Sequence, residues 1–369
     1  MTRITTPVKI GRCALNHRIV MAPLTRLRSE NQVPLDVMVD YYSQRASVPG
    51  TLLITEATFV SKKSSGRDEH APGIYTREQV DAWKRITDQV HEKGSFIYMQ
   101  LWHVGRAARQ QVLDKAGLEM VSSSDIPIDD DHPTPRPMTT EEIQEAIDSF
   151  ATAAKNAIEA GFDGVEIHAA NGYLIDQFTQ DTCNRRSDEW GGNVENRSRF
   201  CLEVAKAVSQ AIGPDRTGIR LSPFSTFQGM RMEDPEPQFT HLISELKPLN
   251  LAYLHLIEPR IAGNMDKTVN DDEESLDFAL EAWAMSGPVV LAGGYTAEKA
   301  NEALERRFKD EPVAFAFGRH FISNPDLPFR LARDIPLAKY DRGTFYKVKS
   351  PDGYTDYPYS EEWIEEQRS

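Results

Sequence analysis

Residues 139–169, TTEEIQEAIDSFATAAKNAIEAGFDGVEIHA, contain the unit that decides the fold. Thr139 and Glu142 have the spacing of a capping box, and apolar residues recur at helical period from Ile143 onward. The short strand Gly164–Ala169 follows directly. A helix leading into a short strand of this kind is typical of a parallel sheet covered on both faces.

The same unit recurs along the whole chain. Amphipathic stretches lie at Thr76–Lys93, Thr139–Ala160, Arg199–Ala211, Gln238–Leu246, Glu274–Met285 and Thr296–Phe308. Between them are short apolar runs at Arg18–Pro23, Thr51–Ala57, Ser95–Leu101, Gly164–Ala169, Thr217–Ser222, Ala252–Ile257, Pro288–Ala292 and Val313–Gly318. No GxGxxG follows the first run, which disfavours an open dinucleotide-binding sheet. Eight short strands that alternate with helices predict an α/β fold, and specifically a (β/α)₈ TIM barrel.

We expect residues 1–369 to form one domain, because barrels of this kind often reach such a length. Residues 106–138 are rich in serine, aspartate and proline, and we expect them to form a small cap or hairpin over the barrel mouth after the third strand. Residues 258–273 are polar and are a candidate lid. We expect the tail 340–369 to pack back on the barrel.

Composition excludes several classes of partner. The net charge of −14 opposes contacts with phosphate backbones, so we expect no nucleic-acid partner. No run approaches the roughly 20 apolar residues of a membrane helix, and the start of the chain lacks the apolar region of a signal peptide. The three cysteines show no CxxC spacing. We expect a cytoplasmic protein, a monomer or a homodimer, that acts on small molecules.

The carboxyl ends of barrel strands hold the active site, and the end of the fourth strand has the strongest constellation. A tight turn there could aim His168 and Asn171 at one substrate oxygen, with Tyr173 near enough to protonate a neighbouring carbon. Reduction of an electron-poor alkene requires this combination. The alternative interpretation is that His168 and Asn171 merely satisfy backbone groups of the loop.

Other chemistries find less support in the sequence. His103, His168, Asp176 and Asp181 could be assembled into a zinc or manganese site, but no HxH, HxxxH or HxxE pattern is present, and we expect no metal. A GxSxG nucleophile elbow is absent, and no strand end supplies a lysine for a Schiff base.

A second group of strand-end residues suits an anion. Gly293, Gly294, Gly318 and Arg319 follow the seventh and eighth strands, where backbone N–H groups and a guanidinium can bind a phosphate. The glycines could instead serve only tight turns.

Two further strand-end residues suit a ring system. Arg220 at the end of the fifth strand is costly to bury unless it meets an anion or an electron-rich ring. Gln100 has both a donor and an acceptor, which suits the edge of a pyrimidine-like ring.

At these residues the sequence resembles the old yellow enzyme family of FMN-dependent ene-reductases, over nearly the whole chain. The matching stretches are MAPLTR at 21–26, QLW at 100–102, GVEIH at 164–168, NGYLIDQF at 171–178, NRRSD at 184–188, WGG at 190–192, ENRSRF at 195–200 and FGRHFISNPDL at 317–327. Any one of these motifs alone would be weak, but the collinear set is specific.

The resemblance implies an FMN site formed by Pro23, Leu24, Thr25, Ala57, Gln100, Arg220, Gly293, Gly294, Gly318 and Arg319. Thr25, where some relatives carry cysteine, would bond the flavin O4 and indicates the Thr-type branch. His168 and Asn171 would hold the substrate oxygen and the nicotinamide amide, and Tyr173 would be the proton donor. Trp102 and Tyr346 would shape the substrate pocket.

The implied activity is that of an NADPH dehydrogenase or ene-reductase with two half-reactions in one pocket. NADPH would reduce FMN, and an α,β-unsaturated carbonyl or nitro compound would then take a hydride and a proton. The alternatives are a flavin-dependent isomerase, a nitro-ester reductase, or a flavin-binding protein without activity. Arg67–His70 replaces an aromatic residue that many relatives have in the loop after the second strand, which puts the substrate preference in doubt.

Overall fold

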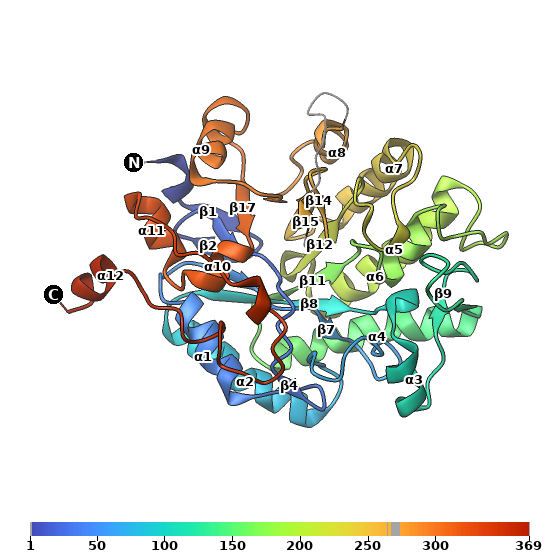
Figure 1. Cartoon of the computed structure of the whole chain (residues 1–369). Coiled ribbons are helices and arrows are strands. Elements are labelled where there is room, and N and C mark those ends of the chain that lie inside the picture. Colours follow the sequence, from blue (N-terminus) through green and yellow to red (C-terminus); the bar gives the residue numbers. More distant parts are fainter. Residues whose placement is uncertain (1, 264, 267–273, 369) are drawn as a thin grey trace.

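The computed structural model describes residues 2–263, 265–266 and 274–368. Eight parallel strands form a closed ring, because each pairs with the next and the last pairs with the first. They are β3 (Ile19–Met21), β6 (Leu52–Ile54), β8 (Phe96–Trp102), β11 (Gly164–His168), β12 (Thr217–Leu221), β13 (Tyr253–Ile257), β16 (Val289–Ala292) and β17 (Val313–Phe317). The short β7 (Thr58–Phe59) continues the pairing along β8. The expected (β/α)₈ barrel is confirmed (Figure 1).

Helices surround the ring and connect its strands. They are α1 (Asp36–Arg45), α2 (Arg77–Glu92), α4 (Thr140–Glu159), α5 (Leu174–Thr179), α6 (Val194–Ile212), α7 (Glu236–Leu246), α8 (Asp277–Trp283), α9 (Ala297–Arg306), α10 (Arg319–Ser323), α11 (Leu327–Arg333) and α12 (Glu361–Glu366). Thr76 and Thr139 form complete capping boxes at the starts of α2 and α4, as their spacing predicts. None of the described helices is long and apolar enough to cross a membrane.

Of the helices expected from the sequence, α6 and α8 differ most in their bounds. α6 begins at Val194 rather than at Arg199, because the Asn193 side chain caps it by accepting from the Asn196 N–H at 2.9 Å. α8 is shorter than the expected stretch Glu274–Met285, since its first residue is Asp277 and its last is Trp283.

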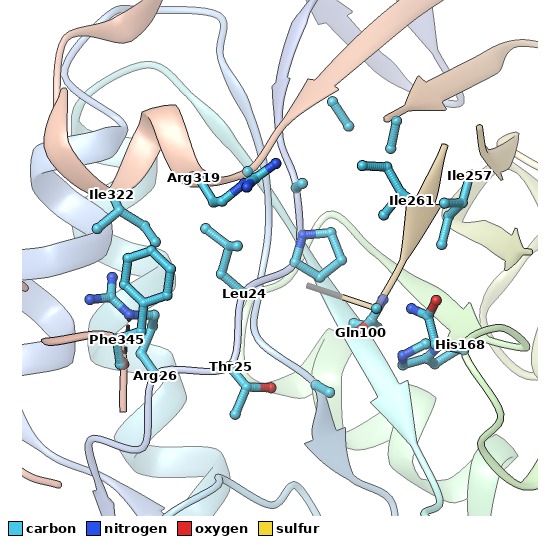
Figure 2. A pocket seen from close by; sticks show the side chains of 18 of the residues that line it. Leu24, Thr25, Arg26, Gln100, His168, Ile257, Ile261, Arg319, Ile322 and Phe345 are labelled. Atoms are coloured by element: carbon cyan, nitrogen blue, oxygen red, sulfur yellow. Dashed lines mark hydrogen bonds between the residues drawn. The ribbon is translucent and has the colours of Figure 1, made fainter. Parts of the chain in front are cut away.

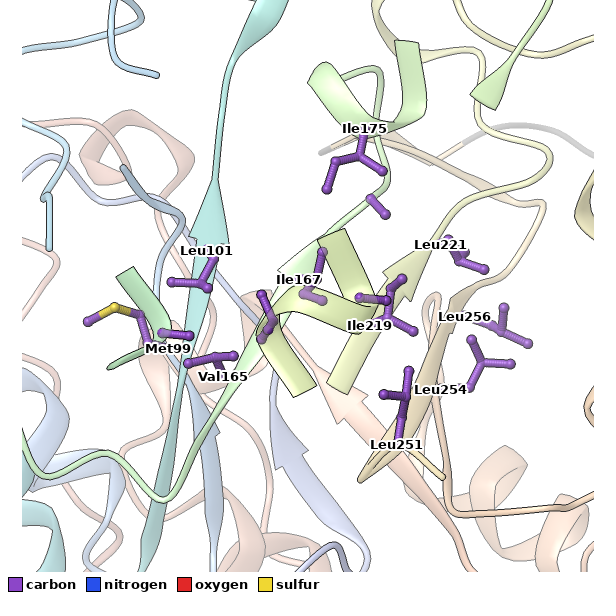
Figure 3. Close-up of a cluster of buried hydrophobic side chains, with 14 of the residues drawn as sticks. Met99, Leu101, Val165, Ile167, Ile175, Ile219, Leu221, Leu251, Leu254 and Leu256 are labelled. Carbon is purple, nitrogen blue, oxygen red and sulfur yellow. The ribbon is translucent and has the colours of Figure 1, made fainter. Parts of the chain in front are cut away.

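Side chains alternate between the two faces of each strand, and this alternation separates the core from the site. The outward residues pack under the helices in one apolar cluster, shown in Figure 3: Met99, Leu101, Val165, Ile167, Ile219, Leu221, Leu254 and Leu256. The residues between them face the barrel interior. Gln100, His168 and Arg220 therefore point inward because Leu101, Ile167 and Ile219 point outward.

The amino-terminal end of the barrel is closed by a hairpin that the sequence did not predict. β1 (Val8–Ile10) pairs antiparallel with β2 (Cys13–Leu15), and their apolar side chains join the cluster inside the barrel. The turn needs Gly11, whose φ is 53° and where a Cβ would overlap the Asp215 carbonyl oxygen. The hairpin therefore covers the end of the barrel that lies opposite the cavity described below.

The segment 106–138 folds as α3 (Gln110–Ala116) and a two-stranded pairing of β9 (Val121–Ser122) with β10 (Arg136–Pro137). That pairing is parallel, so it is not a hairpin. Two small antiparallel pairs lie elsewhere: β4 (Ser29–Glu30) with β5 (Val33–Pro34), and β14 (Ile261–Ala262) with β15 (Met265–Asp266). Residues 264 and 267–273 of the candidate lid lie outside the described residues.

The carboxy-terminal tail is held against the barrel by buried arginines near the ends of β3 and α1. Arg26 donates to the carbonyls of Phe345 and Gly353, and Arg45 donates to the carbonyl of Tyr354. Hydrogen bonds from charged donors are among the stronger ones in proteins. The hydrogen bonds of Arg26 and Arg45 hold the tail in place, and Tyr346 in the tail lies at the mouth of the barrel.

Candidate active site

A cavity of about 790 Å³ opens at the carboxyl ends of the barrel strands. Every residue predicted for the site lines it: Pro23, Leu24, Thr25, Ala57, Gln100, Trp102, His168, Asn171, Tyr173, Arg220, Gly293, Gly294, Gly318, Arg319 and Tyr346. Figure 2 shows Gln100 and His168 from neighbouring strands, with Leu24 and Thr25 following β3 and Arg319 following β17.

The turn after β11 holds Asn171 in a conformation that few residues adopt. Its φ is 57°, in the left-handed region that asparagine tolerates better than most side chains. The Asn171 N–H donates to Ser222 Oγ at 2.8 Å, and its carbonyl accepts from Gln228 Nε2 at 2.6 Å. Gly172 follows with φ 72° and donates its N–H to Asp176 Oδ2 at 2.9 Å. The turn is thus locked on both sides of Asn171.

Aromatic contacts fix the ring of Tyr173 beside His168. Its centroid lies 4.9 Å from that of Trp102 at 88° and 4.9 Å from that of His168 at 69°. Such edge-to-face arrangements are favourable. His168 Nδ1 and Asn171 Oδ1 are buried without a partner among the described residues. The interpretation that these two atoms satisfy loop backbone groups therefore finds no support, and because both residues line the cavity, the atoms are available to a ligand there.

Burial sets the protonation states of this group. It lowers the pKa of His168 to about 3, with a further contribution from the Arg220 charge, so the imidazole is neutral at physiological pH. Burial raises the pKa of the Tyr173 phenol, and the Arg67 charge opposes this effect only in part. A neutral imidazole can donate one hydrogen bond, and a protonated phenol can deliver a proton.

Gln100 and Arg220 lie on the inner face of the barrel near His168. Arg220 faces His168 across the β11–β12 pair, and its Nε atom is buried without a partner among the described residues. Gln100 Nε2 donates to Glu166 Oε1 at 2.8 Å. The amide oxygen of Gln100 is thereby left for a donor in the cavity.

The two glycines after β16 are required by the backbone conformation of the turn. Gly293 and Gly294 have φ values of 142° and 69°, and a Cβ at either would overlap Glu258 or Arg260. The turn itself therefore requires glycine here. Arg319 follows β17, with its guanidinium 5.8 Å from the Tyr340 ring centroid.

The residues present fit FMN. The cavity volume lies in the usual range for cofactor sites, and the strand ends around it supply small residues at Ala22, Ala292 and Ala316. An amide acceptor and a partly buried guanidinium suit the polar edge of a flat ring. By contrast, no group of three or more potential metal ligands occurs in the described part of the chain.

Several cavity residues escaped the sequence analysis. Ile257 ends β13, and a survey of every strand end would have found it. Phe227 and Phe345 come from loops distant in sequence and gave no signal. Arg109, in the segment 106–138, also lines the cavity, beside Arg67 from the loop in which the sequence departs from the expected aromatic residue.

The comparisons with known proteins agree with this geometry. Residues 3–338 match the NADH:flavin oxidoreductase / NADH oxidase family. The chain is 56% identical over 365 residues to chanoclavine-I aldehyde reductase fgaOx3 of Penicillium roqueforti, covering 98% of each chain. It is also 49% identical over 373 residues to a probable inactive reductase, easA of Epichloe festucae var. lolii, covering 100% of this chain and 98% of the relative.

Solved structures give the same assignment. Old Yellow Enzyme from Pichia sp. AKU4542 superposes with a TM-score of 0.90 at 39% identity, covering 98% of this chain and 94% of that one. Morphinone reductase superposes with a TM-score of 0.88 at 39% identity, covering 97% and 96%. The chain therefore belongs to the NADH:flavin oxidoreductase / NADH oxidase family, as an FMN oxidoreductase of the old yellow enzyme type.

Proposed function

We propose that the protein uses NADPH to reduce the activated C=C bond of α,β-unsaturated carbonyl or nitro compounds. The observation that carries this proposal is the group His168, Asn171 and Tyr173 at one edge of the cavity, with polar atoms of the first two left without a partner. A protein that only stored flavin would not need a proton donor such as the partly buried Tyr173. This matters because four relatives, 46% to 49% identical, are named probable inactive reductase or dehydrogenase easA.

Each residue has a separate task. His168 and Asn171 bind the carbonyl or nitro oxygen of the substrate and polarise the conjugated double bond. The β-carbon then becomes electron-poor and able to accept a hydride, which FMN would supply when bound in this cavity. Tyr173 donates its phenolic proton to the α-carbon, which completes the addition of two hydrogens across the bond.

The names of relatives support NADPH as the donor and a carbonyl compound as the acceptor. One relative, 49% identical over 372 residues, is named NADP-dependent oxidoreductase lnbE, which favours NADPH as the donor. Two relatives, 56% and 50% identical, are named chanoclavine-I aldehyde reductases, which favours a substrate with a carbonyl group.

Anaerobic turnover with NADPH and 2-cyclohexenone tests the proposal. We expect one NADPH consumed for each cyclohexanone formed. A panel of enones, enals and nitroalkenes that all leave NADPH-reduced protein unoxidised would overturn it. Rearranged substrate without net NADPH consumption would show an isomerase instead.

A further inference from the structure

A buried carboxylate lies at the centre of a polar layer inside the barrel. Glu166 is fully buried in β11. Its Oε1 accepts from Gln100 Nε2 at 2.8 Å. Its Oε2 accepts from the Tyr253 hydroxyl at 3.0 Å and from His255 Nδ1 at 2.7 Å. Every hydrogen bond of this carboxylate is thus made to a side chain of the barrel interior.

The strand register explains how these groups meet. Glu166 lies opposite Gln100 on one side and Gly218 on the other, and Gly218 lies opposite Tyr253. A Cβ at Gly218 would overlap the Tyr253 ring. The glycine therefore leaves the space through which the tyrosine reaches the carboxylate.

The charge of this layer follows from its contacts. Burial by itself raises the pKa of Glu166, but His255, Arg220 and Gln100 together bring it below its ordinary value, so the group is a carboxylate. Burial lowers the pKa of His255, which is therefore neutral and donates from Nδ1. Its Nε2 atom has no partner among the described residues. Arg220 lies two residues beyond Gly218, the β12 residue opposite Glu166, so both side chains face the barrel interior and the carboxylate offsets the charge of the guanidinium.

We propose that Glu166 is a positioning residue for the flavin: it fixes the orientation of the Gln100 amide and offsets the charge of Arg220. This inference rests on the proposed FMN site, and it adds a residue that touches neither cofactor nor substrate. A carboxylate can only accept hydrogen bonds, so Gln100 must turn its NH₂ group toward Glu166. Its carbonyl oxygen is then presented to the N–H of the pyrimidine ring.

The second task concerns the redox balance. Arg220 alone would stabilise the negative charge that a reduced flavin carries on its pyrimidine edge. Glu166 opposes this stabilisation, so it holds the reduction potential of the flavin lower than Arg220 alone would set it. Removing the negative charge should therefore favour the reduced cofactor.

Three variants separate charge from position. Glu166→Gln keeps the length of the side chain and removes its charge; its amide oxygen can still accept from Gln100. Glu166→Asp keeps the charge but shortens the side chain by one methylene, so the carboxylate no longer reaches Gln100 Nε2. Tyr253→Phe is the matched control, because it removes one hydrogen bond from the same carboxylate and leaves the charge in place.

The readouts are the affinity for FMN and the reduction potential of the bound flavin, with thermal unfolding measured alongside. In Glu166→Gln we expect the affinity for reduced over oxidised FMN to rise about tenfold, a potential higher by about 30 mV. Tyr253→Phe should leave the potential at the wild-type value. Glu166→Asp should bind FMN at least tenfold more weakly and keep the potential.

The outcomes are distinguishable. Wild-type protein that takes up no FMN would overturn the proposed function and this inference together. Wild-type protein that binds FMN, with an unchanged potential in Glu166→Gln, would overturn the inference alone. If Glu166→Gln does not fold, Glu166→Asp decides, because wild-type affinity for FMN in that variant would contradict the positioning of Gln100.

Discussion

Tyr173→Phe removes the proposed acid together with the contact of its hydroxyl group with Gln228. The Tyr173 ring is held by edge contacts with Trp102 and His168, both at centroid distances of 4.9 Å, and these contacts do not involve the hydroxyl group. Phenylalanine should therefore occupy the same place. The variant tests proton donation without disturbing the walls of the cavity.

The magnitude follows from the role of a general acid, which contributes about 10²- to 10⁴-fold to a rate. This corresponds to about 3 to 5 kcal/mol of barrier. The loss should fall on one half-reaction only, because hydride transfer from NADPH needs no proton from the protein. Burial raises the pKa of the Tyr173 phenol, so the wild-type group stays protonated through neutral pH.

Stopped-flow spectroscopy under anaerobic conditions measures the two half-reactions separately. We expect Tyr173→Phe to be reduced by NADPH within about twofold of the wild-type rate. Re-oxidation by 2-cyclohexenone should slow by about 10²- to 10⁴-fold. Trp102→Phe serves as a control for altered cavity walls. Wild-type rates in both half-reactions would refute the assignment of Tyr173 as the acid.

Three further predictions concern the neighbours of this group. Ser222→Ala leaves the buried Asn171 N–H without its acceptor, so the free energy of unfolding in urea should fall by about 1 to 3 kcal/mol, and an unchanged value would contradict the locked turn. Because the pKa of His168 is lowered to about 3, the affinity for a phenol ligand should stay constant from pH 5 to pH 7; an inflection near the ordinary histidine pKa would show that the imidazole titrates there. Arg319→Gln should weaken FMN binding about 10- to 150-fold in a fluorescence titration, since charge-assisted hydrogen bonds contribute about 1.5 to 3 kcal/mol; wild-type affinity would place the phosphate elsewhere.

The strands and most of the candidate site could be predicted from the sequence for one physical reason. Strands covered on both faces are short and apolar, so each stands out between amphipathic helices. The polar residues that interrupt or follow such strands then mark the inner face and the carboxyl ends. Gln100, His168 and Arg220 were found in this way, and all three line the cavity.

Features that depend on distant partners could not be predicted. α1 includes Arg45 among its buried residues, so its apolar pattern is broken. Outside its own helix, that arginine donates to the backbone carbonyls of Phe321, Ile322 and Tyr354. The strands of the amino-terminal hairpin are only three residues each. The role of Glu166 depends on strand register, which places it opposite Gln100 and is not visible in a single strand.

The most direct measurement is a crystal structure of the protein grown with FMN. We predict one FMN with its ring across the mouth of the barrel, its pyrimidine edge at Gln100 and Arg220, and His168 and Asn171 facing the ring from the substrate side. A ring bound outside this cavity, or crystals that take up no FMN at all, would contradict the account.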